Sequence, residues 1–482
     1  MISLLRRTLF PKGSDSLDKL GMSIEDACSH ILAIGGTGSG KTSVLKILLI
    51  DILRRGGRNV GCLWAGVKPD EVENFKKIIA AAGANDRMMI LTPGLFTYNF
   101  LAHEMSVGSP RTATQLLLDL NKIVSRSSGD SDESFWANLF EKMCSSAIAI
   151  CWLAKRKGNG NDSSLTIEDV YKLISSSPAN YEQAGSDAFK NSFCFQMLRL
   201  AERNIINDSD RRLYTQAATF FMAEAVSLGS KARGAAISQV SAVISPFLQS
   251  PLYETVVCDE SSFTPEMAIT GSCVMMNAPI MSCGIGGALF QSLLATQVTE
   301  AALRRATPAH MTLIVRDELQ MLIGDANKEA MNLSVARSQK LSFVSGVQSI
   351  PTLQAAMGGN NAEQELHSLL ANYSTKMILS NPCSKTNKYF SEAWGDSLQE
   401  FVSVSESKEE EPLDLLNMLT GNDRLLFSVS TQLTPRCPVD AFHSLRRGGK
   451  ANRLCVDFFL TQAGRTYGPD HSPYKLVTFK QV

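Results

Sequence analysis

Residues 35–42 read Gly35-Gly36-Thr37-Gly38-Ser39-Gly40-Lys41-Thr42, a complete G-x-x-x-x-G-K-[S/T] motif. The apolar run of residues 30–34 precedes it, and the mostly apolar run of residues 43–50 follows it. This context predicts a strand that enters the motif and a helix that leaves it. Glycines let the backbone turn its N–H groups toward an anion, and the new helix adds the positive end of its dipole. The motif therefore predicts a loop that holds nucleotide phosphates.

Within this loop, each residue type has a distinct role. Lys41 supplies a point charge for the β- and γ-phosphates, and Thr42 offers a hydroxyl to Mg²⁺. We expect residues 35 to 43, including Ser43 at the start of the helix, to surround the phosphates. The sequence thus predicts ATP and Mg²⁺ as ligands.

Composition narrows the class of protein. The 482 residues suffice for roughly two to four domains. Lys and Arg together number 47, as do Asp and Glu, so any site for a polyanion has to be local. The eleven cysteines include no C-x-x-C pair, which argues against a disulfide framework or a zinc site and favours a reducing compartment.

Two segments bear on membrane insertion and targeting. The apolar stretch near Met1 is too short for a signal peptide. Residues 267–299 carry no charge, but Pro279 and several glycines interrupt any spanning helix. We expect a buried strand over 273–276 and a helix from about Gly287, and hence a cytoplasmic protein with no membrane span.

The hydrophobic pattern divides the chain into parts. Residues 31–105 and 263–482 alternate strand-like and helix-like runs, which predicts an α/β motor domain with a mostly parallel sheet and helices on both faces. Residues 106–262 show helical spacing and little strand signal, so they predict an inserted all-α domain. The alternative is that these helices decorate one large domain. Residues 1–30 form a lead-in, 403–411 an acidic loop, and 425–429 and 474–479 strands.

A pair of carboxylates follows a second apolar strand. Residues 312–315 are apolar or β-branched, and Asp317 and Glu318 follow them after Arg316. Asp317 at the strand tip is suited to hold Mg²⁺, and Glu318 to orient and polarise an attacking water. Many buried strands end in exposed acids, which is the alternative explanation. A phosphate loop in the same sheet favours a hydrolytic site.

Two further polar residues fit such a site. Gln348 ends the strand after the Asp317 strand, where its amide is placed to sense a γ-phosphate. Arg337 lies on the intervening helix and is a candidate for an arginine finger that stabilises charge in a neighbouring subunit. The alternative for Gln348 is a surface glutamine at a strand end, and the alternative for Arg337 is a surface ion pair.

The order of these motifs resembles that of the TraG/TraD-type coupling ATPases of type IV secretion and conjugation, relatives of the FtsK/HerA-like hexameric pumps. The phosphate loop, helical insert, Asp-Glu strand, Ala336-Arg337-Ser338 and Val347-Gln348-Ser349 occur in the family's order. Weaker similarities lie at Tyr98-Asn99-Phe100-Leu101, Phe135-Trp136, residues 371–376 and Trp394-Gly395. The resemblance implies a RecA-like P-loop NTPase fold, with Lys41 and Thr42 on phosphate and metal, Asp317 and Glu318 as metal and water residues, Arg337 as the finger and Gln348 as the sensor.

Two features depart from the family pattern. Family members commonly carry membrane helices before the motor, whereas nothing ahead of Gly35 is long enough to span a bilayer. The chain is therefore expected to be soluble or tethered by a partner at the inner face of a bacterial membrane. In addition, residues 64–67 lack the acid that often precedes the lysine of the second strand, so no role is assigned there.

The expected function is a ring-forming ATPase, a homohexamer by resemblance, that moves DNA. Basic clusters at residues 446–453 and at Arg304-Arg305 are candidates to grip DNA phosphates, with solvated surface charge as the alternative. A second hypothesis is a nucleotide-switched platform that docks a relaxase-like protein without pumping. A nucleotide kinase, an ABC subunit and a GTPase are disfavoured because their signature motifs are absent from the sequence.

Overall fold

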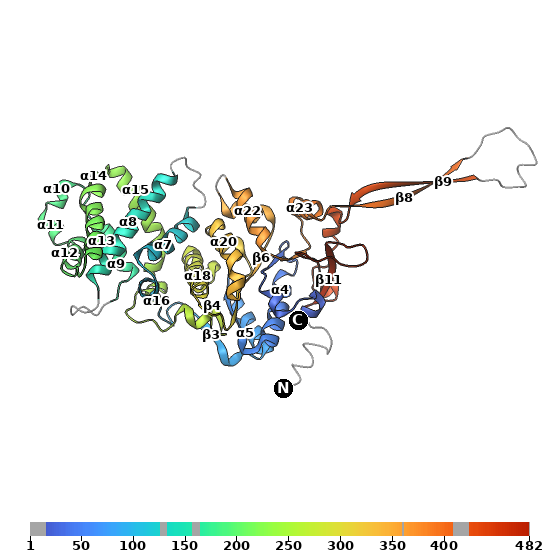
Figure 1. Ribbon diagram of the computed structural model, residues 1–482, viewed down its shortest axis with the longest axis horizontal. Helices are drawn as coiled ribbons and strands as arrows, with labels where there is room; N and C mark the ends of the chain where they lie inside the picture. Colours follow the sequence, from blue (N-terminus) through green and yellow to red (C-terminus); the bar gives the residue numbers. More distant parts are fainter. Residues whose placement is uncertain (1–15, 126–132, 157–163, 359–360, 408–423, 482) are drawn as a thin grey trace, which may run out of the picture.

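A parallel sheet organises the part of the chain that contains the phosphate loop (Figure 1). The computed structural model describes residues 16–125, 133–156, 164–358, 361–407 and 424–481. Nine strands of these residues form one sheet in the order β11-β10-β7-β1-β6-β5-β2-β4-β3. They are β1 (Ile31–Ile34), β2 (Val60–Ala65), β3 (Met88–Leu91), β4 (Cys273–Met276), β5 (Met311–Arg316), β6 (Leu341–Val347), β7 (Thr375–Leu379), β10 (Cys455–Gln462) and β11 (Tyr474–Lys480).

The direction of these strands places their ends. Strands β1 to β7 pair in parallel, while β10 and β11 run antiparallel on one flank. The parallel strands therefore all end at one edge of the sheet, here called the carboxyl edge. Because β10 is antiparallel to β7, its first residue, Cys455, lies at this same edge. Ligands of open α/β sheets bind at such an edge.

Both faces of the sheet are covered, as expected for a parallel sheet. Ile31 and Ala33 belong to one buried cluster with α4 (Lys41–Gly56) and α5 (Glu71–Ala82). Leu32 and Ile34 point the other way, into a cluster with α18 (Ile280–Leu303), α20 (Ala326–Ala336), α21 (Ile350–Met357), α22 (Ala362–Asn372) and α23 (Ser384–Trp394). The alternation follows from the period of two in a strand.

Every regular element described between β3 and β4 is a helix, although these two strands are neighbours in the sheet. Figure 1 shows most of these helices gathered at one end of the molecule. They are α6 (Phe100–Val107), α7 (Pro110–Val124), α8 (Glu133–Ala154), α9 (Ile167–Ser175), α10 (Tyr181–Ala184), α11 (Asp187–Lys190), α12 (Phe193–Arg203), α13 (Asp208–Thr219), α14 (Ala225–Ser227), α15 (Ser230–Ile244), α16 (Leu252–Val256) and α17 (Pro265–Ala268).

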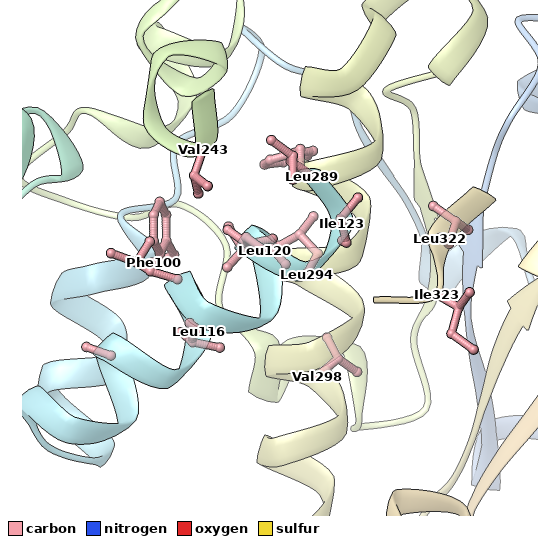
Figure 2. Close-up of a cluster of buried hydrophobic side chains, with 14 of the residues drawn as sticks. Phe100, Leu116, Leu120, Ile123, Val243, Leu289, Leu294, Val298, Leu322 and Ile323 are labelled. Atoms are coloured by element: carbon pink, nitrogen blue, oxygen red, sulfur yellow. The ribbon is translucent and has the colours of Figure 1, made fainter. Parts of the chain in front are cut away.

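An apolar seam joins this helical part to the sheet part. Figure 2 shows Leu116 and Leu120 of α7 beside Leu294 and Val298 of α18, which itself covers the sheet. The buried cluster is continuous from Leu32 of β1 through this seam into the helices. The division into an inserted domain at residues 106–262 stays a prediction, because one core serves both parts.

Three segments differ from the sequence-based expectation. Part of the lead-in belongs to the core: Leu17 of α2 (Ser16–Leu20) is fully buried, and the Ser16 hydroxyl donates to Asp51 of α4 (2.9 Å), whereas the short α3 (Ile24–Ala27) buries only its last residue. Helix α18 begins at Ile280 rather than near Gly287, with a non-helical residue at Gly284. Pro279 directly precedes the first turn of α18. A backbone N–H there would have no acceptor within the helix, so a proline is tolerated.

The third difference is an antiparallel ribbon. Strands β8 (Asp396–Ser407) and β9 (Arg424–Pro435) pair along their whole length and project from the body (Figure 1). Residues 403–407 are therefore strand, where the sequence predicts the start of an acidic loop. The rest of that loop, residues 408–411, lies outside the described residues. Residues 403–407 are mostly serine and glutamate, so no apolar run marks this end of β8 as a strand.

Candidate nucleotide site at the carboxyl edge

The phosphate loop connects β1 to α4 at the centre of the carboxyl edge. Gly35 N–H donates to the carbonyl of Val347 (3.1 Å) after β6, and Gly36 N–H to that of Ser380 (3.0 Å) after β7. Gly38 and Gly40 adopt φ values of +73° and +94°, which side chains other than glycine rarely reach. The loop is thus held by both neighbouring strands in a conformation that the motif's glycines permit.

Lys41 lies inside this loop. Its Nζ donates to the carbonyls of Gly35 (2.7 Å) and Gly36 (3.4 Å), and the side chain is buried. Burial lowers the pKa of Lys41, against the opposing effect of the Glu318 and Asp317 carboxylates. A buried cation bound mainly to carbonyls is poised for an anion that compensates its charge.

Thr42 and Asp317 meet across 275 residues of sequence. The Thr42 hydroxyl donates to Oδ2 of Asp317 at 2.5 Å, and the aspartate is almost fully buried. Asp317 Oδ1 has no hydrogen-bond partner among the described residues, and burial raises the pKa of this carboxyl. A Cβ at Gly346 would lie 3.0 Å from Oδ1, so glycine there leaves room for the carboxylate.

These oxygen donors fit Mg²⁺. The ion favours hard oxygen ligands and is commonly bound by one or two protein groups together with substrate phosphates. Thr42 Oγ1 and the unpartnered Asp317 Oδ1 supply such groups. The described residues contain no cluster of three or more His, Cys, Asp or Glu side chains that would hold a metal unaided. The site is therefore suited to a metal that arrives with a nucleotide.

Glu318 is held by two amides. Gln320 Nε2 donates to its Oε2 at 2.6 Å, and Gln348 Nε2 approaches the same oxygen at 3.5 Å. The carboxylate is buried at the end of β5, directly before α19 (Leu319–Leu322). The structure thus brings Lys41, Asp317, Glu318 and Gln348 to one edge, as the sequence predicts for a hydrolytic site.

Gln320 was missed by sequence reasoning, as was Lys68. Gln320 belongs to no motif, and only its place two residues after Glu318 would have marked it. Lys68 follows β2 in the exposed turn, and its positive charge contributes to lowering the pKa of Lys41. Glu71 orders this turn by accepting from Lys68 N–H (3.2 Å) and Trp64 Nε1 (3.0 Å).

Arg337 is not part of this arrangement in the same chain. It is exposed after the last residue of α20, just before β6 begins at Leu341. The site lies at the other end of β6, and a strand of seven residues spans roughly 20 Å. Within one chain, Arg337 therefore lies at the edge opposite the phosphate loop.

The basic clusters are largely engaged within the fold. Arg446 forms a two-point ion pair with Asp457 (2.6 and 2.8 Å), and Arg447 Nε donates to the Ser380 hydroxyl (2.9 Å). Arg304 pairs with the buried Glu104 (2.7 Å). Arg305 binds backbone carbonyls, including that of His310 (3.1 Å). These contacts favour the structural alternative over DNA binding for these four arginines.

Comparison with known proteins places this site in context. Residues 312–430 match the family described as the TraM recognition site of TraD and TraG. No curated protein matches the chain in sequence. Among solved structures, the bacterial conjugative coupling protein TrwBdeltaN70 in an unbound form is similar with a TM-score of 0.58 at 16% identity, over 99% of this chain and 91% of that one. The resemblance to TraG/TraD-type coupling proteins is confirmed.

Two further structures of the plasmid coupling protein TrwB are similar to this chain. The complex with the ATP analogue ADPNP has a TM-score of 0.59, and the complex with ADP and Mg²⁺ one of 0.56, each at 16% identity over 100% of this chain and 92% of that one. The predicted α/β fold, a RecA-like P-loop sheet with an additional all-α part, is thereby confirmed. Among the described residues, no helix combines the length and apolar character that crossing a bilayer requires.

Proposed function

We propose that this chain is the ATP-hydrolysing subunit of a ring motor that couples or translocates DNA, or a nucleoprotein, in a conjugation or type IV secretion-like system. The observation that carries the proposal is the 2.5 Å contact between Thr42 and Asp317. It joins the phosphate loop to the carboxylate pair in one site. The TrwB complexes with ADPNP and with ADP and Mg²⁺ support ATP and Mg²⁺ as the ligands.

The chain's own residues divide the work of hydrolysis. Mg²⁺ held by Thr42 and Asp317 would supply positive charge that neutralises phosphate oxygens as the terminal phosphoryl group transfers. Lys41 exchanges the carbonyls of Gly35 and Gly36 for phosphate oxygens. Glu318 orients and polarises the attacking water, with one carboxylate oxygen fixed by Gln320. Gln348, beside Glu318, is placed to report the γ-phosphate to it.

The position of Arg337 fits a role between the subunits of a ring. Its position at the edge opposite its own phosphate loop leaves a neighbouring subunit's nucleotide as the site on which it acts. A head-to-tail contact between copies, repeated around a closed ring, would bring one such edge to each nucleotide. A homohexamer, a DNA substrate and a location in the cytoplasm or at the inner face of a bacterial membrane belong to this proposal.

The decisive experiment compares Lys41→Ala with Glu318→Gln. We expect Glu318→Gln to lower ATP turnover by about 10² to 10⁴-fold and to keep ATP binding, because it removes general-base character only. Lys41→Ala should lose both ATP turnover and ATP binding. Glu363→Gln, an exposed glutamate on α22, is the matched control. Wild-type turnover by Glu318→Gln would contradict the assignment.

Whether the ring pumps DNA is tested separately. Turnover of the wild-type protein is measured with single- and double-stranded DNA at two salt concentrations, because phosphate contacts weaken with salt. Stimulation that falls at high salt is expected. Failure of every nucleic acid to stimulate would count against the motor and for the second candidate.

The second candidate is a nucleotide-switched platform that docks a protein substrate. Its support is the match of residues 312–430 to a TraM recognition site, which is a protein-binding description. A relaxase-like or other secretion-system protein is the expected partner. Capture of such a partner by the full chain that tolerates Glu318→Gln would favour this candidate.

A further inference from the structure

The C-terminal flank of the sheet packs directly on the phosphate loop. Gln481, just after β11, donates through Nε2 to the hydroxyl of Ser43 in the first turn of α4 (3.0 Å). A Cβ at Gly40 would lie 2.7 Å from the side chain of Val456 at the start of β10. Residues at the carboxyl-edge ends of β10 and β11 thus lie beside residues 40–43.

The strand order indicates which way a nucleotide extends from this loop. Asp317, Glu318 and Gln348 follow β5 and β6, on one side of β1. The terminal phosphate belongs on that side, since these residues act on it. The nucleoside therefore leaves on the other side of β1, toward β7, β10 and β11.

Two segments form walls on that side. The turn after β7 lies against the loop, since a Cβ at Gly36 would be 2.6 Å from Pro382. The second wall is the segment of residues 446–454, here called the 446–454 loop. Arg447 ties it to Ser380, whose carbonyl accepts from Gly36 N–H.

Gln481 holds the 446–454 loop to α4. Its Oε1 accepts from Gly449 N–H (2.7 Å), and its N–H donates to the carbonyl of Leu454 (2.7 Å), while its Nε2 binds Ser43. The loop then exposes Lys450, Arg453 and Leu454. Leu454 is 40% exposed although apolar, and Arg453 and Leu454 both have positive φ. Such strain at consecutive residues is typical of functional segments.

We propose that the 446–454 loop and the Ser380–Pro382 turn form the subsite for the base and ribose of the nucleotide. Leu454 offers an apolar surface to the base, and the Arg453 guanidinium stacks on its ring. Lys450 and Arg453 thereby serve the nucleotide, whereas the sequence suggested DNA phosphates for this cluster. The proposal rests on the proposed function, because it needs a nucleotide in the phosphate loop.

The test measures equilibrium binding of two probes to the full chain by calorimetry, namely ATP and inorganic tripolyphosphate. The variants are Leu454→Asn and Arg453→Asn, since asparagine tolerates positive φ. Each is expected to weaken ATP binding by about five- to ten-fold, as loss of one apolar or stacking contact with the base does, and to leave tripolyphosphate binding within about two-fold. Leu476→Asn, at an exposed leucine of β11 away from the loop, is the control and should change neither.

The outcomes separate the two proposals. ATP binding that survives both substitutions unchanged, or wild-type affinity for tripolyphosphate equal to that for ATP, would overturn the subsite. A wild-type protein that binds neither probe would instead overturn the proposed function. Gln481→Ala is the third variant: it should weaken ATP binding more than tripolyphosphate binding, because it releases the 446–454 loop without altering the exposed side chains of that loop.

Discussion

Two buried charges of opposite sign share the site in the absence of nucleotide. Burial raises the pKa of Asp317 and lowers that of Lys41, so folding disfavours the charged form of each. Each charge is compensated only in part by the other, and a metal and phosphates would add the missing opposite charges. We therefore expect ligand binding to offset the electrostatic cost of burying these two groups.

This cost predicts that Asp317→Asn stabilises the nucleotide-free protein. A raised native-state pKa contributes stability below the unfolded pKa, and this contribution is lost as pH rises through the native value. The gain from Asn should thus grow between about pH 4 and about pH 8, because asparagine does not titrate and its oxygen still accepts from Thr42. Urea unfolding without Mg²⁺ at both pH values measures it.

The control for this comparison is Asp440→Asn, at an exposed position, which should alter unfolding little. With Mg²⁺ and ATP present, the order should reverse, since Asp317→Asn lacks the metal ligand. Equal stability of Asp317→Asn and wild type at the higher pH would contradict the electrostatic account.

Gln320 is expected to act on catalysis through Glu318. Replacing it with alanine removes a 2.6 Å hydrogen bond to the carboxylate and frees its orientation. A bond to a charged group contributes about 1.5–3 kcal/mol, so kcat should fall by about ten-fold or more. ATP affinity should stay within about two-fold, because Gln320 lies outside the phosphate loop. Steady-state turnover and calorimetry give the two values.

Gln364→Ala, at an exposed glutamine of α22, is the matched control. If Gln320→Ala weakened ATP binding as strongly as turnover, its role would be structural. Wild-type turnover in Gln320→Asn, whose side chain is one methylene shorter, would show that catalysis does not require the 2.6 Å hydrogen bond to Glu318.

At the scale of elements, the start of α4 depends on glycine for two separate reasons. Gly40 has φ +94°, and a Cβ there would also meet Val456 of β10 at 2.7 Å. Gly83, which ends α5, has φ +73°, and no atom lies within 4 Å of the place that a Cβ would occupy there. The two positions therefore separate backbone strain from steric conflict.

Gly83→Ala should cost about 1 kcal/mol of unfolding free energy and leave ATP binding intact. Gly40→Ala should cost more and abolish ATP binding, because both the loop and β10 must move. Thermal unfolding and ATP titration of the two variants test this. Wild-type ATP affinity in Gly40→Ala would show that the loop tolerates displacement.

The β8–β9 ribbon illustrates pairing that local sequence conceals. Leu398 pairs with Leu433 and Val402 with Val429 on one face, and all four are well exposed. Isolated two-stranded ribbons are marginally stable in water. Each strand alone reads as polar alternation, and only the register between them produces an apolar face.

At the scale of the whole molecule, ion pairs reinforce the apolar seam between the helical part and the sheet part. Lys328 of α20 bridges Asp119 of α7 (2.5 Å) and Glu300 of α18 (3.0 Å). Arg304 pairs with the buried Glu104 of α6. Helix α20 follows β5 and α19 along the chain, so these ion pairs tie the segment after Asp317 and Glu318 to α7 and α18.

The proposed ring predicts complementation between inactive subunits. Lys41→Ala and Arg337→Ala are each expected to be inactive alone, since every site would lack one of two required cations. In an equal mixture, about one quarter of the subunit boundaries combine an intact Lys41 with an intact Arg337 of the neighbour. After mixing and reassembly, ATP turnover should therefore recover to about one quarter of the wild-type value.

Mixing Lys41→Ala with Glu318→Gln is the control, because both defects lie on the same side of a boundary and every boundary then carries one of them. Activity of Arg337→Ala by itself, or absence of recovery in the first mixture, would remove the arginine from the mechanism.

Local sequence was enough for the parts of this protein whose chemistry lies within a few residues. The phosphate loop, the helix after it, the Asp317–Glu318 strand end and most strands of the sheet follow from glycine spacing and apolar runs, which act over short distances along the chain. The ends of β5 and β6 were predictable for the same reason.

Tertiary structure alone decided which distant segments meet. The insertion of β6 between β1 and β5 brings Gln348 to Glu318, and the antiparallel β10 and β11 bring Gln481 to Ser43. The placement of Arg337 at the opposite edge likewise follows from the direction of α20. These outcomes depend on strand order and register, which arise from packing between segments far apart along the chain and leave no local pattern in the sequence.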